Sequence, residues 1–153
     1  MPDALPVPVP DPIAVPVPSP RAAERLVACA LVREPGWALE VFERCDESDF
    51  SDDFCAAVFR AAHTLCGIAG GSAGVWDVFR FLRAEGVYGD ALPRLLWGVY
   101  HATPTAVMGA YHANLVRLAA DRRRLRRRLL AAAKDLGDGR AAADVLGELT
   151  AAG

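Results

Sequence analysis

Lysine is almost absent from this chain of 153 residues, since 17 residues are basic and Lys134 is the one lysine among them. Asp135 follows Lys134, so the phosphate-loop pattern GxxxxGK[ST], in which a lysine reaches the nucleotide phosphates, does not occur. The patterns GxGxxG, HExxH and GxSxG are missing too, and the three histidines stand in no nucleophile motif. These absences predict a chain that is not an enzyme by itself and that has no cofactor and no small-molecule substrate.

Paired cysteines and long hydrophobic runs are also missing. The four cysteines form no CxxC pair, so we interpret them as reduced, buried thiols and expect no metal site. The longest stretch without a charged residue, Leu95–Val116, contains Pro104, Asn114, two histidines and two glycines, which makes it a poor membrane span. No basic region precedes an apolar run at the N-terminus, so no secretory signal is visible. We therefore expect a cytoplasmic protein with no membrane partner.

Proline is concentrated at the start of the chain, where residues 1–20 hold eight of the 11 prolines. Repeats such as Pro6-Val7-Pro8-Val9-Pro10 cannot form a helix, because every second residue lacks an N–H donor. Such repeats favour extended polyproline II. We predict residues 1–18 as a disordered, Pro-rich leader, and a ligand for a proline-binding module is the alternative.

Apolar residues recur at helical spacing after this leader, and no alternating strand pattern appears, so the predicted fold class is all-α. Ser19 and Pro20 resemble a helix N-cap followed by proline at the first helical position, and Ser51 resembles another N-cap. Helices are predicted at Arg21–Arg33, Trp37–Arg44, Asp52–Cys66, Val75–Glu85, Leu92–Tyr100, Thr105–Leu136 and Arg140–Ala151. The predicted core includes the aromatic residues Phe50, Phe59, Trp37, Trp76 and Trp97.

The last two predicted helices are separated by Gly137-Asp138-Gly139 and should form a hairpin with one long and one short arm. Leucines recur along the long arm at near-heptad spacing, with Arg122 interrupting them. This candidate packing seam consists of Leu115, Leu118, Leu125, Leu129 and Leu136.

Arginine fills six of seven consecutive positions on the long arm, which we call the arginine belt: Arg122, Arg123, Arg124, Arg126, Arg127 and Arg128. Guanidinium groups at this density bind phosphates or acidic protein surfaces. One interpretation is pairing within the chain, because Glu40–Asp53 holds seven acids against one arginine. A protein interface and a nucleic-acid site are the other two. Few aromatic residues interleave with the arginines, which argues against base stacking.

The order of several short motifs resembles a known family. The first predicted helix carries Ala23-Glu24 before an apolar run to Leu31, and Glu34-Pro35 follows. Further motifs, in chain order, are Asp49-Phe50, Val58-Phe59, Val75 to Gly86, Thr103-Pro104-Thr105-Ala106, Tyr111 and Val116-Arg117. Over about residues 19–150 the chain resembles the N-terminal domain of DnaB-type replicative DNA helicases.

The resemblance implies a compact helical head at 19–103, followed by a helical hairpin with a short second arm at 104–153. In that family the hairpins pair between subunits, and the domains form a collar on a hexameric ring that communicates with primase. The resemblance therefore implies a non-catalytic interaction module in DNA replication, with itself, a DnaB-like helicase or primase as partner.

Two alternatives to this interpretation follow from the same residues. The family's ATPase domain is absent from this sequence, so the chain could be a split helicase fragment whose ATPase half is encoded separately. Direct nucleic-acid binding through the arginine belt is the second alternative, although the net charge of −2 leads us to expect weak DNA binding.

Overall fold

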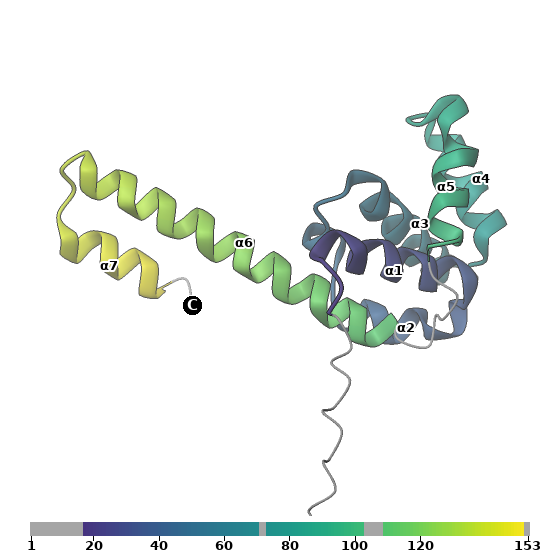
Figure 1. The fold of residues 1–153 in the computed structure, drawn as a ribbon, viewed down its shortest axis with the longest axis horizontal. Coiled ribbons are helices and arrows are strands. Elements are labelled where there is room, and N and C mark those ends of the chain that lie inside the picture. Colours follow the sequence, from purple (N-terminus) through teal and green to yellow (C-terminus); the bar gives the residue numbers. More distant parts are fainter. Residues whose placement is uncertain (1–16, 71–72, 103–108, 152–153) are drawn as a thin grey trace, which may run out of the picture.

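The computed structural model describes residues 17–70, 73–102 and 109–151, and all regular elements within these ranges are helical (Figure 1). The α-helices are α1 (Pro20–Arg33), α2 (Ala38–Phe42), α3 (Asp53–Ala69), α4 (Val75–Glu85), α5 (Leu92–Tyr100), α6 (Gly109–Gly137) and α7 (Ala142–Ala151). Short 3-10 turns lie at η1 (Pro35–Trp37), η2 (Glu47–Asp49) and η3 (Gly89–Ala91). The predicted all-α class, with a helical head followed by a hairpin, is confirmed.

Some predictions fall outside the described residues. They include the leader at 1–18, apart from its last two residues, and the predicted helix start at Thr105. The predicted boundary between head and hairpin, at 103/104, lies there too.

One predicted helix start is confirmed and another is wrong. The Ala22 N–H donates to Ser19 Oγ at 3.2 Å, and Pro20 is the first helical residue of α1. The N-cap of α3 is Asp52 and not Ser51, because Asp52 Oδ1 accepts the Cys55 N–H at 2.9 Å. Ser51 is engaged instead by the carboxylate of Glu24, which lies far from it in sequence.

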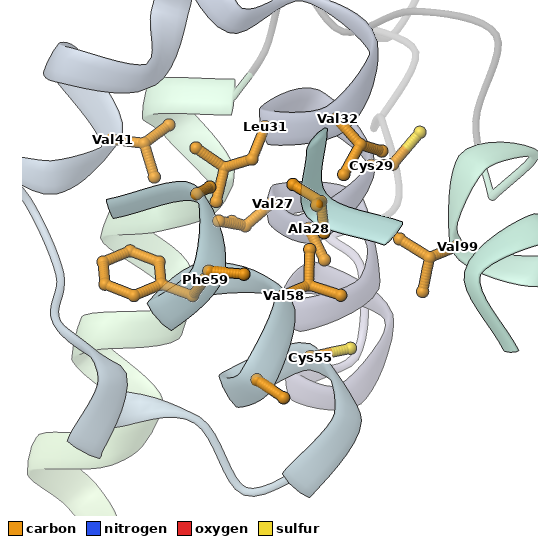
Figure 2. Close-up of a cluster of buried hydrophobic side chains, with 14 of the residues drawn as sticks. Val27, Ala28, Cys29, Leu31, Val32, Val41, Cys55, Val58, Phe59 and Val99 are labelled. Atoms are coloured by element: carbon orange, nitrogen blue, oxygen red, sulfur yellow. The ribbon is translucent and has the colours of Figure 1, made fainter. Parts of the chain in front are cut away.

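The core lies around α1, which packs against α3, α5 and α6. Figure 2 shows the centre of this core, with side chains from α1, α2, α3 and α5 converging: Val27, Ala28, Cys29, Leu31, Val32, Val41, Cys55, Val58, Phe59 and Val99. Phe59 is buried as predicted, and Phe50 is half-buried against the core with its ring centroid 5.2 Å from that of Phe59. All four cysteines are free and buried.

The tryptophans are not core residues, and this part of the prediction is wrong. Trp37, Trp76 and Trp97 are 38%, 71% and 66% exposed. In α5 the buried positions are Leu92, Leu96 and Val99, so the adjacent Trp97 faces outward. The spaces around α1 are filled by small side chains, among them Ala23, Ala28 and Ala30, which leave little room for an indole ring.

Helix α6 is the long arm of the hairpin, and its first part packs on the head. At its start, a Cβ on Gly109 would lie 3.1 Å from the Cβ of Ala30, so the close approach of α6 to α1 favours glycine at this position. The helix then extends well beyond the head, and α7 folds back beside its far end (Figure 1). Within the described ranges, none of the helices combines the length and apolar character that crossing a membrane requires.

Candidate protein-interaction surface

Helix α6 has two apolar sides that meet different environments. Ala113, Val116 and Ala120 are buried against the head. An α-helix turns about 100° per residue, so the opposite side, roughly 180° away, carries the leucine positions predicted as a seam. We call this side the leucine face: Leu118, Leu125, Leu129 and Leu136, which are 48% to 55% exposed.

Leu115 does not belong to the leucine face, although the sequence pattern placed it there. Its side chain is half-buried and packs against the head core. The exposed leucines therefore begin at Leu118, which lies on the side of α6 opposite the head.

Helix α7 covers only one side of α6. Ala132 and Val145 are buried within the hairpin, and Arg128 Nη2 donates to the Leu149 carbonyl at 2.5 Å. Arg140, predicted inside the last helix, instead lies before it and binds Asp135 at 2.6 Å and Glu148 at 2.5 Å. These contacts fix the hairpin and leave the leucine face uncovered.

The arginine belt divides into two groups. Arg123 and Arg124 contact the head, and Arg128 contacts α7. Arg122, Arg126 and Arg127 are exposed, and among the described residues no acidic side chain lies within ion-pair distance of them. The belt is therefore not one continuous basic surface.

The head anchors α6 through two buried carboxylates, of which Glu24 on α1 is the first. Its Oε1 accepts the Ser51 N–H at 2.9 Å and the Ser51 hydroxyl at 2.7 Å, and its Oε2 accepts the Asp52 N–H at 2.8 Å. Arg123 Nη1 lies 3.8 Å from Glu24 Oε1. Glu24 therefore holds together α1, the start of α3 and α6.

Asp49, at the end of η2, is the second buried carboxylate. Arg124 Nη2 lies 2.6 Å from its Oδ1, Arg117 Nη1 lies 3.4 Å from its Oδ2, and its backbone carbonyl accepts from Arg123 Nη2. The Asp46 N–H also donates to Asp49 Oδ2 at 3.0 Å. Ion pairing between the belt and the acidic segment Glu40–Asp53, one of the three interpretations from sequence, is present between Arg124 and Asp49, whereas Arg123 lies near Glu24 and reaches that segment only through the Asp49 carbonyl.

Charges and burial around this junction shift several pKa values. The hydrogen bond to Asp49 raises the pKa of Arg124, and the hydrogen bond from the Ser48 hydroxyl lowers the pKa of Asp46. Burial, followed by the nearby charge of Asp49, raises the pKa of the Cys45 thiol to about 12. The thiol therefore stays protonated at neutral pH, which is the state of an unreactive cysteine.

Sequence reasoning missed the roles of Glu24 and Asp49. The signal was present for Glu24, because an acid inside the buried stretch of α1 must find partners or lose stability. No group of three or more His, Cys, Asp or Glu side chains in the described ranges is arranged to hold a metal ion.

Comparison with known proteins decides which fold this is. Neither a family model nor a curated protein matches the chain. The structure matches the crystal structure of the N-terminal domain of DnaB helicase from Mycobacterium tuberculosis, with a TM-score of 0.73, 25% identity and coverage of 85% of this chain and 92% of that chain. The fold is that of a DnaB N-terminal domain.

The motifs that carried the sequence resemblance have physical roles in this DnaB N-terminal fold. Glu24, Asp49 and Arg117 belong to the polar junction that holds α6 on the head, and Val116 is buried beside them. Phe50 and Phe59 pack against one another in the core. The resemblance was therefore carried in part by residues that position α6 and in part by residues of the head core.

Proposed function

We propose that this chain is a non-catalytic protein–protein interaction module of DNA replication, which self-associates through its hairpin and binds a DnaB-like helicase or primase in the cytoplasm. The observation that carries the proposal is the leucine face on α6. The DnaB N-terminal fold supports the link to a replicative helicase.

The leucine face has the spacing of a helix-pairing surface. Leu118 and Leu125 are seven residues apart, as are Leu129 and Leu136, so a second long helix laid along α6 would contact all four. A contiguous exposed apolar surface of this kind is uncommon on a monomer and is typical of an interaction site. Arg122 and Arg126 flank the leucines on one side, which matches the polar rim of a protein interface.

Sedimentation velocity on the full chain tests self-association, with one matched pair of variants. Leu129→Glu places a charge in the leucine face, and Leu130→Glu places the same charge on the adjacent residue, which is 61% exposed but roughly 100° around the helix. We expect the wild type and Leu130→Glu to associate as concentration rises, and Leu129→Glu to remain a monomer. A wild type that stays monomeric at ~100 μM, well above typical Kd values for specific complexes, would refute this part of the proposal.

Binding to a helicase or primase needs a separate experiment. Immobilised wild-type chain should retain a DnaB-like helicase or primase, and Leu129→Glu or a variant with Arg122→Glu and Arg126→Glu should retain less. Circular dichroism would check that each variant remains helical. If neither partner is retained by the wild type, the replication role is wrong even where the chain self-associates.

Nucleic-acid binding is the second candidate, because Arg122, Arg126 and Arg127 are exposed. These side chains are spread around α6 and do not form one strip, so few could contact the same phosphate backbone at once. We expect weak binding to labelled DNA at about 150 mM salt, near physiological ionic strength. Submicromolar binding that Arg126→Glu and Arg127→Glu remove would favour the nucleic-acid function over the protein interface.

A further inference from the structure

A second apolar surface lies on the head, at the end away from the hairpin, where α4 and α5 pack side by side (Figure 1). A groove of about 410 Å³ runs between these two helices. Among the described residues, its lining has no charged side chain and includes Trp76, Phe79, Pro93, Leu96, Trp97 and Tyr100. The size falls in the range of small ligand-binding sites.

The aromatic rings of this groove form two pairs with the same spacing in sequence and different ring orientations. Trp76 and Phe79 are three residues apart on α4, with ring centroids 6.1 Å apart. Trp97 and Tyr100 have the same spacing on α5, with centroids 6.2 Å apart and ring planes 18° from parallel. Each helix therefore contributes one short aromatic ridge, and both tryptophans remain exposed.

Grooves lined by aromatic rings are the surfaces that recognise polyproline II segments, because proline rings pack flat against tryptophan and tyrosine. Such a ligand reaches the groove already extended, so little conformational entropy is lost on binding. This chain contains a segment of that composition, since Pro6-Val7-Pro8-Val9-Pro10 alternates proline with an apolar residue and carries no charge.

We propose that the groove between α4 and α5 binds the chain's own Pro6–Pro10 repeat. The N-terminal segment then docks on the head, and the hairpin stays free for its partner. The described lining residues of this groove are apolar or aromatic, which suits an uncharged segment.

The length of the intervening chain permits this contact. Arg25 Nη2 on α1 donates to the Gly98 carbonyl at 3.1 Å. Gly98 adjoins Trp97 on α5, so α1 runs beside one of the two helices that form the groove. Ser19 precedes Arg25 by six residues, or about 9 Å along a helix. Pro10 precedes Ser19 by nine residues, which span about 28 Å as polyproline II. Pro16 and Pro18 lie within three residues of Ser19, so no more than about 9 Å of polyproline II chain separates them from α1.

Attachment to the head makes even weak binding sufficient. A segment joined by a short linker has an effective concentration in the millimolar range at a site it can reach. A groove with millimolar affinity for the repeat would therefore be occupied for a large part of the time.

The indole N–H signals of the full chain, measured by nitrogen-15 NMR, test this proposal. Pro8→Ala combined with Pro10→Ala should shift the signals of Trp76 and Trp97 and leave that of Trp37, which lies outside the groove, unchanged. Pro16→Ala combined with Pro18→Ala is the matched control and should leave all three signals in place. Trp97→Ala, at an exposed position, should abolish the response of Trp76 to the first pair of substitutions.

A synthetic peptide of residues 5–11 provides the reciprocal measurement. At millimolar concentration it should return the Trp76 and Trp97 signals of the Pro8→Ala and Pro10→Ala chain toward their wild-type positions. Unchanged Trp76 and Trp97 signals in the substituted chain would overturn the proposal, as would equal shifts in the control pair. Signals that depend on protein concentration would also overturn it, because the occupant would then come from a second copy.

Discussion

The head and the hairpin are built from the same kinds of residues but use leucine differently. Leu31, Leu82 and Leu92 on the head are almost fully buried, whereas Leu118, Leu125 and Leu129 on α6 are about half exposed. The spacing of apolar residues is helical in both regions. The difference is therefore not in local sequence but in how many neighbouring helices each region meets.

Helix α1 is surrounded by partners, while the far part of α6 packs, among the described helices, against α7. Fully burying a leucine is worth about 1.5–3 kcal/mol, so half-exposed leucines leave part of this stabilisation unrealised. A further helix packed on these leucines would bury them and supply the remaining stabilisation. The comparison thus separates residues that stabilise the fold from residues that remain available for binding.

Leucine truncation tests the comparison most strongly. Leu82→Ala should cost about 2–5 kcal/mol of unfolding free energy, because it leaves a cavity in the head core. Leu129→Ala should cost less than about 1 kcal/mol at dilute protein concentration, where association adds little stability. Urea denaturation of both variants gives these values, and equal losses would show that the two regions do not differ in this way.

Removing a buried carboxylate should have the next largest effect. Glu24→Ala deprives two backbone N–H groups and one hydroxyl of their acceptor, at a cost of roughly 2–4 kcal/mol. Glu43→Ala removes an exposed carboxylate and should change stability by less than about 0.5 kcal/mol. Similar costs in thermal or urea unfolding would mean that Glu24 does not hold the junction.

The sequence predicts the features that depend on neighbouring residues and not those that depend on contacts between distant residues. The helices of the head and the burial of Phe59 were predictable, because apolar spacing and caps act locally. The partners of Glu24 and Asp49 were not predictable, since Ser51, Arg117 and Arg124 lie distant in sequence. Trp97 does not follow the general tendency of large aromatic rings to be buried, because Leu96 beside it is the core residue of α5.

The candidate interaction surface was predicted only in part, because some of its features depend on contacts between residues distant in sequence. The leucine positions followed from heptad spacing, but which side α7 covers depends on the turn at Gly137-Asp138-Gly139. Six arginines within seven consecutive positions gave no indication of which side chains meet the head. That division depends on the orientation of α6 relative to α1 and η2.

Some arginines of the belt contact the head and others are exposed, so the same substitution should change the melting temperature differently at the two kinds of position. Arg124→Ala should lower the melting temperature by a few degrees, because Asp49 and Ser48 lose a partner. Arg127→Ala should leave it nearly unchanged, because Arg127 is exposed and contacts none of the described acidic groups. Differential scanning calorimetry at one protein concentration measures both, and a larger effect at Arg127 would contradict the assignment.

A smaller effect is expected from the Cys45 thiol at alkaline pH. Its pKa is about 12 in the folded chain, against an ordinary value of 9.0, so the folded chain keeps a proton that the unfolded chain loses. The stability contributed by this proton is present below pH 9 and is lost as the pH rises from there toward 12. Unfolding free energies at about pH 8 and about pH 10 should fall less steeply for Cys45→Ala than for the wild type. An identical slope would show that Cys45 does not contribute.

The central claim is that the leucine face of α6 is covered by the hairpin of another copy, and site-specific photo-crosslinking tests it most directly. Benzoylphenylalanine would replace Leu129 in one full-length variant and the neighbouring Leu130 in another. We predict that the probe at position 129 gives a cross-linked dimer whose linked peptide lies within residues 109–151, and that the probe at 130 gives far less. No cross-link at 129, or equal yields at the two positions, would contradict the claim.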